Sequence, residues 1–490
     1  MKLSLPLWRT APAALPALHN VPRHSGAGAK AFVTFIGLFL AAFFGLASAV
    51  LPWQYLVGLF GLPVLFLVGT VAPTVPFVAA LLLLFGVMPE FVMAALPLGG
   101  ATLRPAELVL IFSFITVMAR VLLGHIDLMN LVKPIRWVLI VLACGLALGF
   151  FKGKLLANNT LALADARQYV GWLALPIGLW FTVAHPGRLQ RVVIGIALLA
   201  ATLMILQLGL GVQLIFGFRG AEYLSKDFTD VTRSAIGGGL FFLSYAAYRL
   251  FLHACDGERW RWTALFGCLI AIGGIVASFN RAVWAGFAIG AFALLLLKPR
   301  TRNSTLLPFV VLITFVCVGI AGLFLAKPRT GDAIVERVVS LKDEGRRGSS
   351  LGFRFDENQQ ALEALRRNPV TGIGMGGEYK RAYRQLSTAG SFDIEDAFIH
   401  NGYLSLWLKQ GVFGLVFPVM LFVTLWRYFW RGRREQQTTA PLEQTAVFST
   451  VILLFVSALT SPDFSTSSAL AAITALLAIF LNGQSRRNSH

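Results

Sequence analysis

Charged residues are scarce in this sequence. They make up 13% of its 490 residues, while hydrophobic residues make up 57% and the mean hydropathy is +0.72. The charged share is about half of that in soluble domains, which excludes an ordinary soluble protein. Apolar runs of about 18 residues or more recur from end to end, and the short alternating segments typical of a membrane β-barrel are absent. The sequence therefore predicts an all-α polytopic membrane protein.

Cysteines and metal-binding motifs are also scarce. The chain has four cysteines, at Cys144, Cys255, Cys268 and Cys317, and none lies in its most polar segment. No CxxC or Cys/His spacing is present, so we expect no disulfide framework, no metal site and no cofactor. A glycine-rich run at residues 372–377 is not a dinucleotide-binding motif, because no βαβ pattern surrounds it.

An ordinary signal peptide is not evident at the N-terminus. The first apolar run begins near Ala31, too far from Met1 for a signal sequence, so we expect an uncleaved first helix. We expect about 12 transmembrane helices and at most about 14. The candidate spans are 31–50, 55–70, 72–95, 105–123, 136–151, 169–184, 192–216, 236–252, 263–278, 282–297, 306–326, 402–426, 446–460 and 464–482.

The basic residues predict the orientation of these helices. The formal net charge is +19, and Lys and Arg concentrate in short loops and tails, where they orient helices and contact anionic membrane lipids. No interleaving of aromatic and basic residues indicates nucleic-acid binding. Basic segments at 298–302 and 427–434 are predicted to be cytoplasmic, which places the polar segment between them on the outer face. The expected organisation is a cytoplasmic tail (1–30), transmembrane helices with short loops (31–326), a large outer loop (327–400), C-terminal transmembrane helices (401–482) and a cytoplasmic tail (483–490).

The large outer loop is the most polar part of the chain. Residues 327–399 hold 12 Lys or Arg and 11 Asp or Glu. Apolar residues at helical spacing in 332–341 and 353–367 predict two amphipathic helices that lie on the membrane surface or cover a cavity. Asn368-Pro369 is expected to end the second helix. The glycines at 372–377 allow either a plain turn or a close approach to a ligand.

A histidine at the end of this loop is a candidate general base. His400 precedes the start of an apolar helix, and an unperturbed pKa of about 6.5 suits proton transfer near neutral pH. Asn401 is placed to cap that helix or to fix the imidazole tautomer. The upstream carboxylates that would raise the basicity of the ring are Asp393, Glu395 and Asp396. The alternative is an interfacial histidine that hydrogen bonds a nearby backbone group.

Cationic residues on the same predicted face are candidate ligands for an anion. Arg281 interrupts a long apolar stretch, and Arg233 precedes a helix that begins with three glycines at 237–239. An arginine in such a place needs a partner, which is either an internal carboxylate or carbonyl, or an anionic ligand such as a phosphate. The glycines allow close approach of a ligand or of another helix. The further candidates on this face are Arg219, Lys226 and Arg354.

Ionisable residues are lacking in the middle of the apolar runs. Glu107, Arg120 and Arg249 all stand within a turn or two of a helix end. Coupled transporters usually carry ionisable residues or broken helices at the bilayer midplane. This distribution disfavours a transporter but does not exclude one.

Four motifs resemble the O-antigen ligase and polymerase superfamily of bacterial inner-membrane proteins, in the order that the family has them. They are Arg233…Gly237, Ser278-Phe279-Asn280-Arg281-Ala282, Arg366-Arg367-Asn368-Pro369-Val370-Thr371-Gly372-Ile373-Gly374, and His400-Asn401-Gly402-Tyr403-Leu404 with Gly411-Val412-Phe413-Gly414. The resemblance covers about half of the chain, from Arg233 onward. The sequence departs from the family at Asn280-Arg281-Ala282, where many relatives have Ser-Arg-Gly.

This resemblance implies a GT-C-type glycosyltransferase in the inner membrane of a Gram-negative bacterium. The outer loop would then be periplasmic, and the donor would be a polysaccharide on undecaprenyl diphosphate. The reaction would need no metal, and a single displacement at the anomeric carbon would invert its configuration. The residue roles would be His400 as the base, Asn401 and Tyr403 as its support, and Arg281, Arg233, Arg219, Lys226 and Arg354 as ligands of the diphosphate.

O-antigen ligase is the function that we favour within this superfamily. A ligase transfers the polysaccharide to a sugar hydroxyl of lipid A core, which completes lipopolysaccharide. The basic outer face suits a phosphorylated acceptor of this kind. The alternatives are an O-antigen or exopolysaccharide polymerase that uses the same donor, a protein O-oligosaccharyltransferase, and a lipid or sugar transporter.

Overall fold

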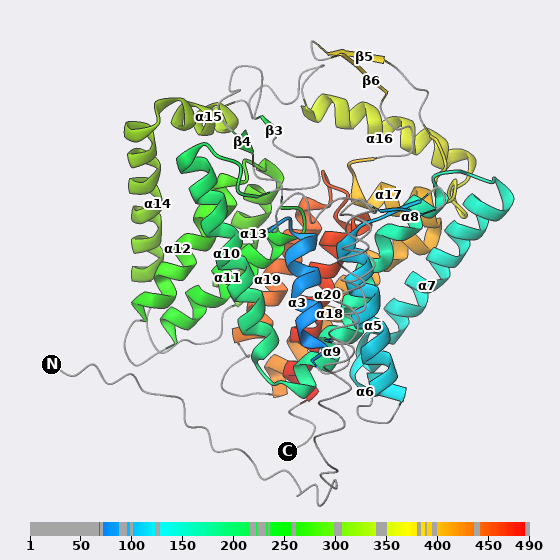
Figure 1. Cartoon of the computed structure of the whole chain (residues 1–490), viewed down its shortest axis with the longest axis horizontal. Coiled ribbons are helices and arrows are strands. Elements are labelled where there is room, and N and C mark those ends of the chain that lie inside the picture. Colours follow the sequence, from blue (N-terminus) through cyan, green and yellow to red (C-terminus); the bar gives the residue numbers. More distant parts are fainter. Residues whose placement is uncertain are drawn as a thin grey trace, which may run out of the picture. The chain divides into compact units, whose positions relative to one another are not determined.

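The described part of the protein is a bundle of helices with three small hairpins. The computed structural model describes residues 68, 72–87, 96–98, 101–122, 128–215, 222–223, 232–233, 236–256, 261–297, 306–339, 350–379, 384–387, 390–393, 399–435 and 442–485. Within these residues, helices are joined by connections that include three two-stranded antiparallel hairpins (Figure 1). The all-α prediction therefore holds for the long segments and misses these short strands. The predicted spans 31–50 and 55–70 lie outside the described residues, apart from Val68.

The helices follow one another along most of the chain. Before the outer loop they are α3 (Thr74–Leu84), α5 (Pro105–Leu122), α6 (Leu128–Val132), α7 (Arg136–Phe150), α8 (Ala162–Arg167), α9 (Ala174–Ala184), α10 (Arg188–Leu210), α11 (Gly239–Cys255), α12 (Trp262–Ala277), α13 (Arg281–Leu297) and α14 (Leu306–Ala326). Residues 327–400, the outer loop predicted from the sequence, and the C-terminal part contain α15 (Pro328–Val339), α16 (Ser350–Arg367), α17 (Gly402–Gln410), α18 (Val412–Glu435), α19 (Leu442–Ser457) and α20 (Ser467–Ser485). The 3₁₀ turns are Lys133–Ile135, Gln168–Leu173 and Asp463–Ser465, and Phe151–Leu156 is a π-helical turn. The hairpins pair β1 (Leu96–Leu98) with β2 (Ala101–Leu103), β3 (Glu222–Tyr223) with β4 (Thr232–Arg233), and β5 (Arg384–Ser387) with β6 (Gly390–Asp393).

Several of these helices suit a membrane. Four segments are long and apolar enough to cross one, namely Pro105–Leu122, Leu128–Leu156, Arg188–Leu210 and Val412–Gly432. Shorter apolar helices of 10–17 residues accompany them in the described part of the chain. Large apolar side chains are exposed on these helices, for example Phe266, Phe292 and Val318, as expected for surfaces that face lipid. The protein is thus compatible with a polytopic membrane protein, and the count of about 12 spans stays a prediction.

One predicted span is wrong at its beginning. Residues 402–426 were expected to form a single helix, but α17 ends at Gln410 and α18 begins at Val412. Gly411 between them has a φ of +62°, and a side chain there would collide with the Val370 carbonyl. The backbone breaks because only glycine fits this left-handed conformation beside another strand of chain. The break separates α17, at the end of the outer loop, from the long helix α18.

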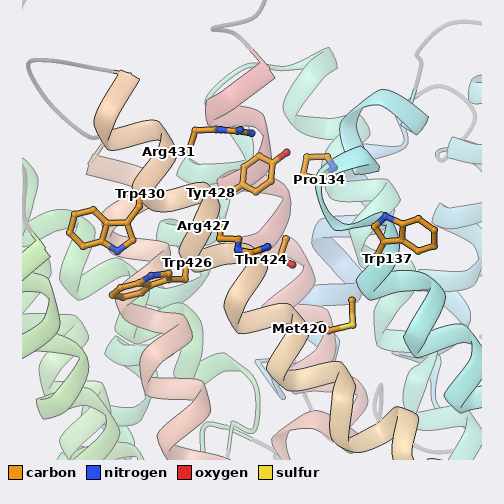
Figure 2. Close-up of a pocket in the computed structure, with 9 residues that line it drawn as sticks. All are labelled: Pro134, Trp137, Met420, Thr424, Trp426, Arg427, Tyr428, Trp430 and Arg431. Atoms are coloured by element: carbon orange, nitrogen blue, oxygen red, sulfur yellow. The ribbon is translucent and has the colours of Figure 1, made fainter.

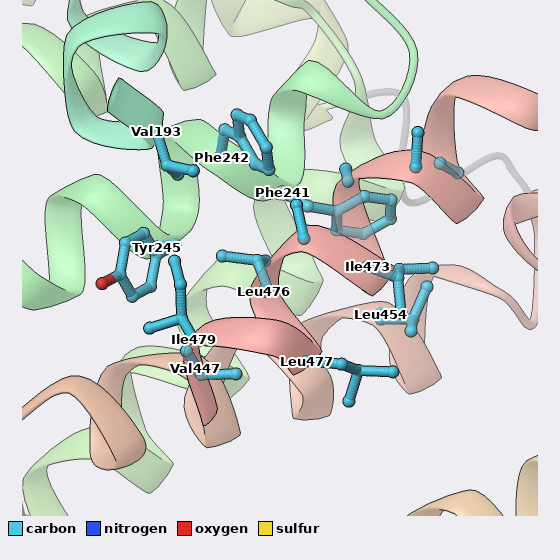
Figure 3. Close-up of a cluster of buried hydrophobic side chains, with 14 of the residues drawn as sticks. Val193, Phe241, Phe242, Tyr245, Val447, Leu454, Ile473, Leu476, Leu477 and Ile479 are labelled. Atoms are coloured by element: carbon cyan, nitrogen blue, oxygen red, sulfur yellow. The ribbon is translucent and has the colours of Figure 1, made fainter. Parts of the chain in front are cut away.

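The core surrounds α20. Every residue from 467 to 481 is buried, as expected for a helix that is apolar on all sides. Figure 3 shows Phe241, Phe242 and Tyr245 of α11 facing α20, with Val447 and Leu454 of α19 beside them. Each side chain of this size that is removed from water stabilises the fold by about 1.5–3 kcal/mol. The centre of the bundle is therefore closely packed and largely apolar.

Fully or partly buried ion pairs lie near the ends of the helices. Glu107, in the first turn of α5, is fully buried and lies 3.5 Å from Arg167 Nε. It also accepts a hydrogen bond from Ser467, the first residue of α20. Arg249, near the C-terminal end of α11, forms a 2.7 Å ion pair with Glu443 at the start of α19. These charges sit at element ends, as the sequence predicts, because a buried charge is stable only with a partner.

The two helices of the outer loop rest on different parts of the bundle. Ala333 and Ile334 of α15 pack on Phe279, in the turn before α13. Ala361 and Leu365 of α16 pack on α17 and on Ile399. The predicted helices are thus present and are anchored to the bundle. On the predicted apolar face of α16, Leu365 is buried, whereas Phe355 and Leu362 are exposed.

Candidate active site

His400 is held by a buried carboxylate of α16. Its Nδ1 and its backbone N–H both lie 3.1 Å from Glu357 Oε2. The Glu357 side chain is 1% exposed, whereas that of His400 is 32% exposed. An ionised carboxylate accepts hydrogen bonds, so this contact assigns the ring proton to Nδ1 and leaves Nε2 as the basic nitrogen. The imidazole is therefore oriented from the buried side and reachable from the open side.

The helix that follows His400 has a well-formed N-terminus. Asn401 Oδ1 accepts hydrogen bonds from the backbone N–H groups of Tyr403 (3.0 Å) and Leu404 (3.2 Å). Of the two predicted roles of Asn401, capping is the one that the structure shows, since the histidine tautomer is set by Glu357. Tyr403 donates its hydroxyl to the Phe455 carbonyl at 2.7 Å, which ties α17 to α19.

The connection between α19 and α20 brings distant segments together. The Gly402 N–H donates to the Ala458 carbonyl at 2.8 Å, which places the start of α17 at the end of α19. The Gly238 N–H donates to Ser468 Oγ at 3.3 Å, which places the start of α11 at the start of α20. Residues 458–468 thus contact both the His400 segment and the segment that follows Arg233.

Arg281 reaches the same end of the bundle through α13. A side chain at Gly286 would meet the backbone of Leu453, and one at Gly290 would meet that of Ser449, so α13 and α19 run antiparallel in close contact. One turn further along this register, the beginning of α13 lies level with the C-terminal end of α19. His400 and Arg281 therefore flank the same end of α19, and their location on one face of the membrane stays a prediction.

The turn before Arg281 has an unusual backbone. Phe279 has a φ of +50°, which is rare for an aromatic residue, and its ring is buried under α15. Asn280 Oδ1 accepts the Val283 N–H at 3.3 Å and caps α13, while the Ser278 hydroxyl donates to the Ile275 carbonyl. This local frame fixes the first residue of α13, Arg281, at the helix terminus.

The other predicted cations are described less fully. Arg233 lies in β4, opposite Glu222 of β3 in the backbone register. Arg219 and Lys226 lie outside the described residues. Arg354 is half-buried on α16, three residues before Glu357 and therefore on the same side of that helix. Of the carboxylates predicted to act on His400, Glu395 and Asp396 lie outside the described residues, and the side chain of Asp393 is not described.

The glycine-rich segment after α16 is a structural lock. Ile373 N–H donates to the Leu408 carbonyl at 2.7 Å, and Met375 N–H donates to the Gly149 carbonyl at 2.9 Å. Gly376 N–H donates to Asp165, which also forms a 2.6 Å ion pair with Lys409. The close approach that the glycines allow is thus an approach to α7, α8 and α17, and the predicted alternative of a ligand-binding loop is not needed to explain them.

Lys152 adds a second lock to this segment. Its ammonium group donates to Asn368 Oδ1, Thr371 Oγ1 and the Gly372 carbonyl. Three acceptors satisfy the three donors of an ammonium group. The glycines at 237–239 are also explained by packing, because side chains there would collide with Ser468 or with Phe85 and Ile236.

Sequence reasoning missed two acidic residues of the site. Glu357 stands four residues before Ala361 and eight before Leu365, so it occupies the buried stripe of α16. A carboxylate on that stripe was a readable signal. Asp463, in the connection between α19 and α20, accepts hydrogen bonds from Ser457 (2.6 Å) and Ser461 (2.8 Å). Burial raises the pKa of the Asp463 carboxyl, and these two hydrogen bonds oppose the rise.

A central segment of the chain matches a known protein family. Residues 266–419 match the family model described as O-antigen ligase. The predicted resemblance to the O-antigen ligase superfamily is confirmed. The matched O-antigen ligase segment runs from α12 into α18, so it contains Arg281, Arg354, Glu357 and His400. It begins after Arg233.

A relative in Haemophilus influenzae shares part of the sequence. An uncharacterized protein of Haemophilus influenzae (strain ATCC 51907 / DSM 11121 / KW20 / Rd) is 26% identical over 214 residues, which are 42% of this chain and 53% of the relative. The match therefore spans about half the length of that protein. Family members of this type act as membrane glycosyltransferase-like ligases or polymerases, which sets the class of reaction to consider.

Proposed function

We propose that this protein is an O-antigen ligase of the Gram-negative inner membrane, with its active site facing the periplasm. It would transfer O-antigen polysaccharide from undecaprenyl diphosphate to a sugar hydroxyl of lipid A core. The observation that carries the proposal is the His400–Glu357 pair, located in the matched O-antigen ligase segment. A half-exposed imidazole whose Nδ1 is held by a buried carboxylate is a suitable base for deprotonating an alcohol.

The reaction then follows from the placement of these groups. The acceptor hydroxyl gives its proton to His400 Nε2 while its oxygen attacks the anomeric carbon of the donor. The bond from that carbon to the diphosphate oxygen breaks, and the electron pair leaves with the undecaprenyl diphosphate. Glu357 keeps the ring in the correct tautomer and stabilises the imidazolium that forms. A single displacement of this kind inverts the anomeric configuration.

The leaving group needs positive charge close to the membrane surface. Arg281 starts α13 and lies at the same helix end as His400, and a guanidinium there would bind the diphosphate with two parallel hydrogen bonds. Arg233, in the strand before α11, is proposed as the second ligand, and Arg354, Arg219 and Lys226 as further ones. No metal is required in this scheme, because the arginines supply the charge stabilisation.

The lipopolysaccharide profile of a deletion strain tests the ligase proposal. A ligase predicts the loss of all O-antigen from lipid A core while polymer persists on the lipid carrier. Core that carries a single repeat unit would show a polymerase instead. Normal attachment of O-antigen to core would contradict both the ligase and the polymerase. Normal lipopolysaccharide together with a loss of protein glycosylation would indicate a protein O-oligosaccharyltransferase.

The buried charges weigh against the transporter alternative. In the described part of the chain, Glu107 and Arg249 both lie near helix ends and have partners of opposite charge. A substrate pathway through the membrane usually exposes polar groups at its midpoint. The helices around α20 pack closely, and most of their buried side chains are apolar.

A further inference from the structure

A cavity lies at the end of the bundle opposite to His400. It has a volume of about 1140 Å³ and is formed mainly by the last three turns of α18 and the beginning of α7 (Figure 2). The first residue of α18, Val412, donates to the Val370 carbonyl beside the glycine-rich lock, so the start of α18 belongs to the His400 end. The lining residues of α18 begin at Met420 and end at Arg431, toward the other end of the same helix.

The cavity changes in polarity along α18. Met420 and Thr424 line its inner part, and Arg427 and Arg431 line its outer part. The eleven residue steps from Met420 to Arg431 correspond to about 16 Å along a helix. An occupant that fits this gradient is apolar at one end and carries negative charge at the other.

The outer part of the cavity is positively charged. Arg427 and Arg431 are one helical turn apart, and both are exposed. Among the described residues that line the cavity, none is acidic. Lys133 and Arg136 flank the lining residues Pro134 and Trp137 in the sequence, which adds to the positive potential at this end.

Tryptophans surround the boundary between these two parts. Trp137 is 60% exposed and Trp426 is 41% exposed, and Trp430 also lines the cavity. Indole rings prefer the level of lipid headgroups, where their N–H contacts polar groups and their rings contact acyl chains. Tryptophans beside arginines at a helix end are what a membrane interface selects.

We propose that this cavity binds one anionic phospholipid of the membrane. Its phosphate would lie between Arg427 and Arg431, since guanidinium groups bind phosphate oxygens in pairs. Its glycerol would lie among the indoles, and one acyl chain would extend toward Met420. The site is separate from the His400 end and does not depend on the proposed transferase function.

Lipid binding to the purified full-length protein tests this proposal. Native mass spectrometry and thermal shift would compare phosphatidylglycerol with phosphatidylcholine, using wild-type protein in detergent micelles. We expect phosphatidylglycerol to remain bound and to raise the melting temperature. Phosphatidylcholine should bind at least tenfold more weakly and raise the melting temperature less. The double variant Arg427→Gln/Arg431→Gln should lose most of this difference between the two lipids.

A matched control is present at the same end of the bundle. Arg188 and Arg191 are exposed in the first turn of α10, and Gln190 between them contacts Glu443 just after α18. Arg188→Gln/Arg191→Gln removes equal charge and should keep the preference for phosphatidylglycerol. Equal loss in both double variants would overturn the proposal, because it would show a general effect of charge.

A second variant tests the apolar part without changing charge. Met420→Trp should fill the inner end of the cavity and weaken phosphatidylglycerol binding at least several-fold. Unchanged lipid binding in both Met420→Trp and the Arg427/Arg431 double variant would overturn the site. Binding of soluble glycerol phosphate as tightly as phosphatidylglycerol would also overturn it, because it would indicate a phosphate site rather than a lipid site.

Discussion

The His400–Glu357 pair and the glycine-rich lock at 368–377 both lie in the predicted outer loop. They differ in how far their polar groups are satisfied by contacts within the protein. In the lock, backbone groups and the side chains of Lys152 and Asp165 satisfy one another. At the pair, a buried carboxylate holds one side of an imidazole whose side chain is still 32% exposed. The lock is a part of the scaffold, whereas the imidazole of the pair is accessible from solvent.

This difference gives two of the motifs that resemble the family different roles, one structural and one chemical. The Asn-Pro-x-x-Gly-x-Gly motif positions α17 by attaching it to α7 and α8, and α17 positions His400. Substitutions in the lock should therefore act on stability, and substitutions at the pair should act on the reaction. The predictions below test that division.

The largest effect is expected for His400→Ala. Loss of the general base should slow glycan transfer by about 10²–10⁴-fold, since positioned acid–base groups contribute about that much. The thermal unfolding midpoint should change little, because His400 is partly exposed. Near-normal transfer by the purified variant, measured with lipid-linked donor and core acceptor, would show that His400 is not the base.

Donor binding should weaken strongly in Arg281→Gln. Hydrogen bonds to a charged group are worth about 1.5–3 kcal/mol, which corresponds to a loss of roughly 10- to 150-fold in affinity. Binding of an undecaprenyl diphosphate analogue to the purified variant measures this. Arg188→Gln, at the other end of the bundle, is the control, and equal affinity in the two variants would remove Arg281 from the site.

Glu357→Gln should have a smaller effect on the same reaction. A glutamine can still contact the ring but no longer fixes the tautomer or stabilises the imidazolium, so we expect a loss of about 10- to 100-fold, as for other groups that orient a histidine. Glu363→Gln, at an exposed position of the same helix, is the matched control. A positioning role also predicts an altered pH dependence of transfer; an unchanged pH profile with reduced yield would indicate a purely structural residue.

A pair of glycines tests the scaffold side of the comparison. Gly376 has a φ of +68°, and a side chain there would collide with the backbone of Ala162, whereas Gly187 has a φ of +73° with nothing within 4 Å. Both alanine variants carry the cost of a left-handed residue, about 1–3 kcal/mol. Thermal unfolding should show the larger destabilisation for Gly376→Ala. Equal unfolding midpoints in the two variants would mean that the close contact between Gly376 and Ala162 adds nothing to the destabilisation.

The smallest effect concerns Asp463 and pH. Its pKa in the folded protein is raised above the ordinary value of 3.8, so protonation favours the fold. That contribution is fully present below the unfolded pKa and is lost as the pH rises through the folded-state pKa. Relative to Asp463→Asn, the wild-type protein should therefore gain thermal stability as the pH falls through this window. A relative loss on acidification would contradict the assignment.

Much of the fold was readable from apolar runs because lipid and a packed core both select long hydrophobic helices. The boundaries of α5 and α13, for example, lie within a residue of the predicted spans. The break at Gly411 was not readable, since it depends on contact with Val370, which is distant in sequence. His400 and Arg281 were found from their positions at the ends of apolar runs.

Glu357 was missed for a different physical reason. Carboxylates near His400 in the sequence were considered first, but the partner that the structure provides comes from a helix 43 residues earlier in the chain. Its place on the buried stripe of α16 was visible in the helical spacing with Ala361 and Leu365. Which carboxylate reaches the imidazole is decided by how α16 packs on α17, and no local pattern encodes that packing.

A double-mutant cycle of His400 and Glu357 tests the central claim most directly. If Glu357 acts only by holding His400, the variant His400→Ala/Glu357→Gln should transfer glycan no more slowly than His400→Ala alone. The rates would come from purified proteins with equal thermal stability. Losses that multiply in the double variant would contradict the account, because they would show that the two residues act independently.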